Sequence, residues 1–168
     1  LYGDGLVEHD NMVGQLLDKL DDLKIADNTI VSYTTDNGAE KFTWPDGATA
    51  RYRGEKNSTW EGGFRVPAMM RWTGKIPAGQ VVNEIGAHND WIPTFMAAVG
   101  DDSIVADLKK GKKLNGKKYK VHLDGYNLLD KLKEGKSTTA DNNKDWPRKA
   151  FFYVTDGGSI SGVRVGDW

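Results

Sequence analysis

The first third of the chain changes from helical to strand periodicity. Leucines and Val13 recur at helical spacing, with acids and lysines between them, which predicts an amphipathic helix over about residues 4–26. Residues 29–35 are β-branched and apolar, and Asp36-Asn37-Gly38 follows them, which predicts a buried strand. A helix followed closely by a strand is half of an α/β unit, so we expect this strand to lie in a parallel sheet.

Beyond the strand the periodicity fades and then returns. Residues 38–63 lack periodicity and contain five glycines, which predicts a long loop. Long ordered loops in compact domains are usually functional. Residues 66–72 are a further candidate strand. Asp90 stands at the N-cap position of a helix that we expect to run to Val99 and to end at Gly100.

The last third reads as polar segments followed by a hairpin. Residues 101–125 are polar and lysine-rich, and we expect a short helix over 126–132 and a loop over 133–149. Two alternating runs, 150–154 and 160–165, flank Asp156-Gly157-Gly158, which predicts a β-hairpin. The expected fold class is therefore α/β, with flanking helices and a small antiparallel β segment at the C-terminal end.

Composition narrows the classes of protein without choosing among them. The 168 residues carry a net charge of −1 and include no cysteine, which excludes disulfides, thiolate metal sites and a cysteine nucleophile within this sequence. No apolar run approaches the ~18 residues that a membrane span needs. The segment from Lys109 to Lys120 contains seven lysines but one aromatic residue and no arginine. We therefore interpret it as a solvated loop and expect no nucleic-acid partner.

The candidate chemistry begins where the predicted strand ends. Asp36 and Asn37 offer a carboxylate and an amide oxygen side by side, which are hard ligands suited to Ca²⁺ or Mg²⁺. In open α/β sheets, ligands bind beyond the carboxyl ends of the strands. Asn37-Gly38 is also a strong turn signal, so a plain turn stays open as the alternative.

The long loop carries the other candidate residues. Lys56 lies between glycines and can hold an anionic oxygen as a point charge, although a solvated lysine is the simpler interpretation. Gly62-Gly63 indicates either close backbone approach or a positive φ. Arg65 is expected to pair internally. Trp44 and Tyr52 are candidates for contacting a substrate, with packing inside the loop as the alternative.

The histidines do not form a cluster in the sequence. His9, His88 and His122 are far apart, and the helical pattern places His9 on the exposed side.

Several segments together resemble the sulfatase family of the alkaline phosphatase superfamily, in the same order and at similar spacing. They are Asp10-Asn11-Met12-Val13-Gly14-Gln15-Leu16-Leu17, residues 30–38, Trp44-Pro45-Asp46-Gly47, residues 53–67, Asn89-Asp90-Trp91-Ile92-Pro93-Thr94-Phe95, Leu123-Asp124-Gly125-Tyr126-Asn127-Leu128-Leu129 and Val163-Arg164-Val165-Gly166-Asp167-Trp168. The resemblance implies that this chain is the C-terminal portion of a sulfatase. Residues 1–125 would be part of the catalytic α/β domain, and residues 126–168 would begin a smaller C-terminal subdomain.

The resemblance also implies roles for particular residues. Asp36 and Asn37 would bind Ca²⁺ or Mg²⁺, and Lys56 would contact a sulfate oxygen. The nucleophile of the family is a formylglycine made from Cys or Ser in a Cys/Ser-x-Pro-x-Arg motif, and this sequence contains no such motif. We therefore expect the formylglycine to lie in an N-terminal part of the protein, and we expect this chain alone to be inactive and to self-associate.

The substrate that the resemblance implies is a sulfated small molecule or carbohydrate. It also suggests a periplasmic or secreted location, and no membrane partner is expected. Two other functions stay open at this point. A phosphoester or phosphonate hydrolase of the same superfamily would share the metal-binding aspartate, and a non-catalytic binding module would share only the fold.

Overall fold

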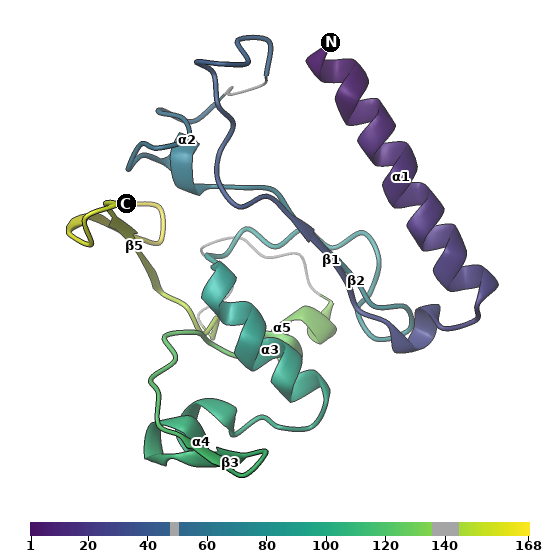
Figure 1. The fold of residues 1–168 in the computed structure, drawn as a ribbon, viewed down its shortest axis with the longest axis vertical. Helices are drawn as coiled ribbons and strands as arrows, with labels where there is room; N and C mark the ends of the chain where they lie inside the picture. Colours follow the sequence, from purple (N-terminus) through teal and green to yellow (C-terminus); the bar gives the residue numbers. More distant parts are fainter. Residues whose placement is uncertain (48–50, 136–144) are drawn as a thin grey trace. The chain divides into compact units, whose positions relative to one another are not determined.

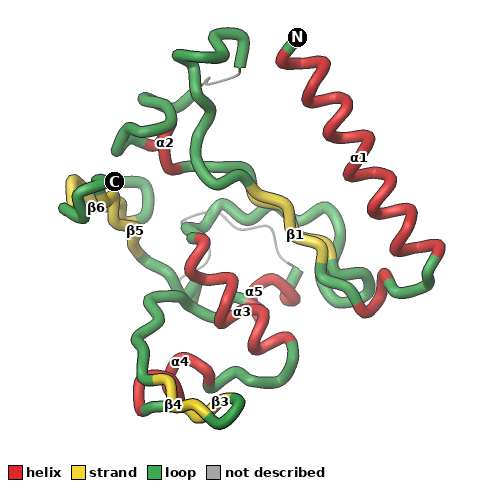
Figure 2. Tube along the Cα trace, viewed as in Figure 1, coloured by secondary structure: helices red, strands yellow, loops and turns green. Residues whose placement is uncertain are grey.

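The computed structural model describes residues 1–47, 51–135 and 145–168, which form two compact units (Figures 1 and 2). The first unit contains Leu1–Ile76 and Phe152–Val163, and the second contains Pro77–Phe151 and Arg164–Trp168. Among the described residues, no helix has the length and apolar character needed to cross a bilayer. The boundary expected at residue 125 concerns the domains of a longer protein, and it stays a prediction.

The first unit begins with the predicted helix, α1, which spans Tyr2–Asp22. The helix ends earlier than expected because Lys24 adopts a left-handed backbone conformation, with φ of 57°, before the 3-10 turn η1 at Ala26–Asn28. His9 is exposed, as predicted. No residue of α1 is fully buried: on its apolar face Val13, Leu17 and Leu20 are half-buried, whereas Leu16 and Leu23 are exposed.

The predicted strand is present, but its partner runs in the opposite direction from the one expected. Strand β1, Val31–Thr34, pairs antiparallel with β2, Ala68–Arg71, in the register Val31↔Arg71 and Thr34↔Ala68. The strand at residues 66–72 is therefore confirmed, whereas parallel pairing of β1 is wrong. The two strands form a sheet of their own, which leaves β1 half-exposed rather than buried.

The C-terminal hairpin is confirmed. Strand β5, Ala150–Val154, pairs with β6, Ile160–Val165, around a turn in which Gly158 has φ of 80°. The backbone N–H of Thr155 donates to the carbonyl of Ser159 at 2.8 Å and closes the turn.

The second unit contains most of the buried apolar residues. Its helices are η2 (His88–Asp90), α3 (Trp91–Ala98), α4 (Ile104–Lys110) and α5 (Leu129–Glu134). Helix α3 contacts both α4 and α5. The core side chains come from α4, from the start of α5 and from the segment after residue 144: Ile104, Leu108, Leu128, Leu129 and Trp146.

The lysine-rich segment is more ordered than the sequence analysis predicts. In place of a loop, it contains the end of α4 and a two-stranded hairpin, β3 (Lys112–Leu114) and β4 (Lys117–Tyr119). Apolar and polar residues do not alternate clearly in these strands. The sequence signal for a hairpin is therefore the Asn115-Gly116 turn, where both residues have positive φ.

The helix expected over residues 126–132 begins later, as α5. Before it, the N–H groups of Tyr126 and Leu128 donate to the side chains of Asp90 and Thr94, at 2.8 and 3.0 Å. These contacts hold the segment in a non-helical conformation. Residues 136–144 of the loop expected over 133–149 lie outside the described residues.

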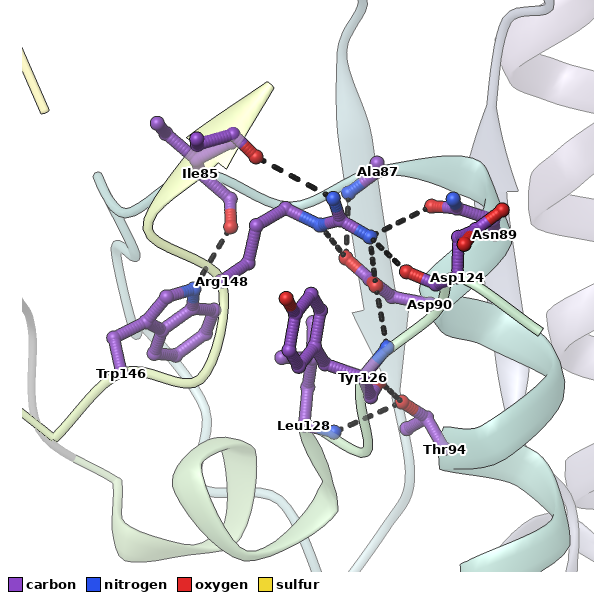
Figure 3. Close-up of polar contacts among 11 residues, drawn as sticks. Ile85, Ala87, Asn89, Asp90, Thr94, Asp124, Tyr126, Leu128, Trp146 and Arg148 are labelled. Carbon is purple, nitrogen blue, oxygen red and sulfur yellow. Dashed lines mark hydrogen bonds and ion pairs between the residues drawn. The ribbon is translucent and has the colours of Figure 1, made fainter. Parts of the chain in front are cut away.

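A buried ion pair closes the second unit (Figure 3). The guanidinium of Arg148 donates to both carboxylate oxygens of Asp90, at 2.6 and 2.8 Å, and the side chain of Asp90 is fully buried. The same carboxylate accepts the N–H of Ala87 at 2.9 Å. Asp90 does stand at the N-cap position of α3, but its side chain makes no cap hydrogen bond to that helix because it binds these partners instead.

Candidate active site

The segment after β1 bends at Asp36-Asn37 but does not form a hairpin turn. Gly38 lacks a positive φ, which a two-residue Asn-Gly hairpin turn requires. The hydroxyl of Thr35 donates to the carbonyl of Asn37 at 3.1 Å and shapes the bend. Asp36 is exposed and Asn37 is half-exposed, so both side chains are accessible at the end of the strand. The bend is therefore not a two-residue hairpin turn, and the role of Asp36 and Asn37 as metal ligands stays a prediction.

Gly38 is needed because another segment crosses it closely. A Cβ atom at Gly38 would lie 1.7 Å from the carbonyl oxygen of Gly62, nearer than any atom can approach. The N–H of Gly38 donates to the carbonyl of Gly63 at 2.8 Å. Of the two explanations for Gly62-Gly63, close backbone approach is therefore confirmed, and neither residue has a positive φ. The loop before α2 is thereby fixed against the end of β1.

This crossing brings Lys56 to the same place. The backbone N–H of Lys56 donates to the carbonyl of Ala39 at 3.1 Å, immediately after the Asp36-Asn37 bend. Its Nζ lies 3.9 Å from a carboxylate oxygen of Glu40, at the outer limit of an ion pair, and the side chain is 40% exposed. An ion pair with this distance and this solvent exposure contributes little to the stability of the protein. The ammonium group is thus held near the strand end without a tight partner.

The loop that carries Lys56 is tied down on both sides. Glu55 accepts the backbone N–H groups of Lys41 and Phe42, at 2.6 and 3.1 Å. Ser58 donates its hydroxyl to the carbonyl of Glu55 at 2.6 Å and accepts the N–H of the same residue. Lys56 therefore sits on a backbone whose polar groups are satisfied, although its own side chain reaches solvent.

The sequence analysis missed Tyr153 and Glu61, which support the loop from the side of α2, Glu61–Phe64. The hydroxyl of Tyr153 donates to Glu61, and the ring of Tyr153 packs edge-on against Phe64 with 5.3 Å between centroids. Arg65 forms an ion pair with Glu61 at 3.3 Å, so its predicted internal pairing is confirmed. Tyr153 lies 92 residues from Glu61 in sequence, and no local pattern signals a contact over that separation.

The two aromatic candidates differ in their surroundings. The guanidinium of Arg65 lies over the ring of Tyr52 at 4.6 Å, which supports the loop-packing interpretation for that residue. Trp44 is 46% exposed and touches Tyr2, with 6.4 Å between ring centroids. A little under half of the surface of Trp44 is therefore still accessible to a ligand.

The donor set at the strand end suits a hard cation but does not complete a site. Asp36 and Asn37 offer one carboxylate and one amide oxygen, the ligand types that Ca²⁺ and Mg²⁺ prefer. Across residues 1–47, 51–135 and 145–168, no group of three or more His, Cys, Asp or Glu side chains is placed to hold a metal ion. Asp36 and Asn37 therefore offer two oxygen ligands, fewer than a Ca²⁺ or Mg²⁺ ion takes.

Comparison with known proteins gives one consistent family. The Sulfatase family model matches residues 1–101. The chain is 42% identical over 101 residues to N-acetylgalactosamine-6-sulfatase of Canis lupus familiaris, an alignment that covers 59% of this chain and 19% of that protein. It is 35% identical over 148 residues to human steryl-sulfatase, covering 84% of this chain and 23% of the relative. Arylsulfatase of Hemicentrotus pulcherrimus is 32% identical over 168 residues, covering 99% and 26%.

Solved structures agree with the sequence comparisons. The crystal structure of PsFucS1 sulfatase from Pseudoalteromonas sp. superposes with a TM-score of 0.74 at 28% identity, covering 96% of this chain and 28% of that one. The crystal structure of Ps i-CgsB in complex with k-i-k-neocarrahexaose gives a TM-score of 0.58 at 30% identity, covering 76% and 25%. The α/β fold class, as part of an alkaline-phosphatase-like fold, is confirmed. The chain spans 19% to 28% of the length of these proteins.

Proposed function

The chain belongs to the sulfatase family, and from this we propose that the full-length protein hydrolyses sulfate esters with Asp36, Asn37 and Lys56 in its active site. The observation that carries the proposal is the crossing of Gly38 by Gly62-Gly63, which brings the Lys56 loop to the end of the strand that bears Asp36 and Asn37. A carboxylate for a cation and an ammonium for an anionic ester thereby share one edge of the fold. We propose aryl or carbohydrate sulfates as the substrate class.

Each group has a distinct task in this proposal. Asp36 and Asn37 would hold a Ca²⁺ or Mg²⁺ ion, which when bound supplies positive charge for the sulfate oxygens. Lys56 would donate hydrogen bonds from Nζ to a sulfate oxygen and stabilise the negative charge that grows as the ester bond breaks. Its weak contact with Glu40 supports this role, because little interaction would be lost when the sulfate binds.

The remaining groups lie outside this chain in our proposal. A formylglycine nucleophile and the other metal ligands would come from another part of the full-length protein. A periplasmic or secreted location belongs to the same proposal, and fractionation of the host cells with an antibody to the protein would test it.

The test compares two aspartates of the full-length protein. Asp36→Ala is expected to abolish metal-dependent turnover of a chromogenic aryl sulfate, because it removes the only carboxylate at the bend. Asp46→Ala is the matched control, since Asp46 lies in a Pro-Asp-Gly turn and accepts the N–H of Tyr2 at 3.3 Å. Turnover of both variants is measured across calcium and magnesium titrations. Equal losses in the two variants would contradict the assignment of Asp36 as a ligand.

A phosphoester hydrolase is distinguished in the same experiment. We expect the wild-type full-length protein to hydrolyse the aryl sulfate faster than the matching aryl phosphate. Mass spectrometry of the full-length protein for formylglycine provides the independent check, because that modification defines the nucleophile that we propose.

A further inference from the structure

The lysine-rich hairpin formed by β3 and β4 is a rigid element, although its sequence resembles that of a solvated loop. Asn115 and Gly116 both have positive φ, 47° and 80°, which is the backbone of a tight two-residue hairpin turn. At the other end, the N–H of Val121 donates to the carbonyl of Leu108 in α4 at 3.1 Å. The hairpin is therefore fixed to α4 at its base and closed at its tip.

One lysine of the hairpin is used for anchoring. Nζ of Lys112 binds Asp101 at 2.5 Å and Asp107 at 3.3 Å, and the side chain is only 23% exposed. Ser103 donates to the same carboxylate of Asp107 at 2.9 Å. Hydrogen bonds to Asp101 and Asp107 raise the pKa of Lys112 above its ordinary value. Both nearby acids are thereby committed to a single lysine.

The other six lysines between residues 109 and 120 are on the surface. In the part of the chain that the structure describes, none of them forms an ion pair with an acid. They are all exposed, and they are Lys109, Lys110, Lys113, Lys117, Lys118 and Lys120. The result is a set of exposed cationic side chains along α4, β3 and β4, on a chain whose net charge is −1.

The pairing of the strands concentrates this charge in an unfavourable way. Lys113 lies directly opposite Lys118 in the antiparallel register. Like charges in this position repel and destabilise a hairpin, by a few tenths of a kcal/mol up to about 1 kcal/mol. A bound polyanion would convert the repulsion into attraction, because two of its negative groups would face two ammonium groups.

We infer that this basic hairpin binds a sulfated polysaccharide chain, through residues other than those proposed for the active site. The inference rests on the proposed function, which supplies a sulfated substrate class. Lysine ammonium groups act as point charges and suit sulfate groups spaced along a flexible chain. Nucleic acid fits less well, because the segment has no arginine and its one aromatic ring, Tyr119, is near Nζ of Lys117 at 5.4 Å.

The experiment uses the full-length protein and dextran sulfate as the probe, with uncharged dextran and duplex DNA as comparisons. The test variant is Lys113→Gln/Lys118→Gln. The matched control is Lys19→Gln/Lys24→Gln, which removes the same charge from two exposed lysines near the end of α1. We expect the Kd for dextran sulfate at low salt to rise by roughly fivefold or more in the test variant only, and the salt dependence of binding to weaken.

Three results would overturn the inference. They are equal loss of binding in the control variant, unchanged binding in the test variant, and binding of duplex DNA as tight as that of dextran sulfate. Turnover of a small aryl sulfate is measured in parallel and is expected to be the same in the test variant and the wild type. The aryl sulfate carries one charged group and does not need the hairpin, so the two measurements test different proposals. Absence of turnover in the wild-type protein would contradict the proposed function. Loss of dextran sulfate binding in the test variant alone would still support binding by the hairpin.

Discussion

Two groups of charged residues in this chain, Asp90 with Arg148 and Asp36 with Lys56, differ in their burial. Around Asp90 and Arg148 the charges are buried, and every polar partner in Figure 3 is within the fold: Arg148 also binds the side chain of Asn89 at 2.9 Å and the carbonyl of Asp124 at 3.1 Å. Around Asp36 and Lys56 the charged side chains reach solvent, and only the backbone beneath them is fixed. The charged groups of the first cluster bind one another and the backbone around them, whereas those of the second are accessible from solvent.

The difference is between buried charges whose hydrogen bonds are satisfied and exposed charges whose roles stay predictions. A buried ion pair persists only when its hydrogen bonds are satisfied, because an unpaired buried charge is very costly. The Asp90 carboxylate raises the pKa of Arg148, so the guanidinium stays charged at any ordinary pH. The Lys56 ammonium makes one long contact with Glu40, at 3.9 Å. Because the ammonium group is in contact with water, it needs no closer partner. The glycine crossing supplies the rigidity there that buried hydrogen bonds supply around Asp90.

The largest expected effect comes from breaking the buried cluster. Arg148→Ala should lower the free energy of unfolding by about 3–5 kcal/mol, because it leaves the Asp90 carboxylate buried without its cation. Lys149→Ala is the matched control, since the neighbouring lysine is exposed and should change stability by about 0.5 kcal/mol or less. Urea denaturation of the full-length protein measures both. A change below 1 kcal/mol for Arg148→Ala would mean that the pair is not a structural support.

The next effect comes from the exposed cluster and should show the reverse pattern. Lys56→Ala should lower kcat for an aryl sulfate by roughly 100-fold, because it removes a contact that is strongest in the transition state. Stability should change little, since the backbone hydrogen bonds of the loop remain. Lys41→Ala, at an exposed lysine in the same loop, is the control. Unchanged turnover in Lys56→Ala would remove this residue from the mechanism.

The sequence predicts those parts of the fold that local periodicity determines. Helix α1, the helix that follows Asp90 and the C-terminal hairpin all match their hydrophobic patterns or turn residues. The direction of the β1–β2 pairing depends on how the chain returns after the long loop, which periodicity does not record. The β3–β4 hairpin was missed because consecutive lysines hide the alternation of a strand.

For the candidate site, the sequence identifies residues but not the contacts that support them. Asp36, Asn37 and Lys56 come from residue chemistry and from the family resemblance, and their roles stay predictions. Gly62-Gly63 signals close approach correctly, although the sequence does not say what approaches. Tyr153 had no signal at all, because its partner Glu61 is distant in sequence and both residue types are common.

Tyr153 offers a sharper test of how the exposed cluster is kept rigid. Tyr153→Phe keeps the ring against Phe64 and removes the hydroxyl that donates to Glu61, which should cost about 1 kcal/mol. If that contact positions α2 and the Lys56 loop, kcat should fall by about fivefold while KM changes less. Tyr52→Phe is the control, because it also removes a tyrosine hydroxyl while keeping the ring that Arg65 contacts. Equal kinetics in the two variants would show that the Tyr153 hydroxyl supports folding alone.

The last expected effect concerns Trp44, the exposed aromatic residue proposed to contact the substrate. The indole is 46% exposed, so a ligand can cover it without displacing Tyr2. Contact with an aromatic face is worth about 0.5–1.5 kcal/mol, so Trp44→Ala should raise KM for an aryl sulfate by roughly two- to tenfold. Turnover at saturation should stay near the wild-type value, because a binding contact made equally in the ground and transition states does not alter kcat. Initial rates over a range of substrate concentrations separate the two constants. A fall in kcat with unchanged KM would show that Trp44 shapes the loop and does not bind the leaving group.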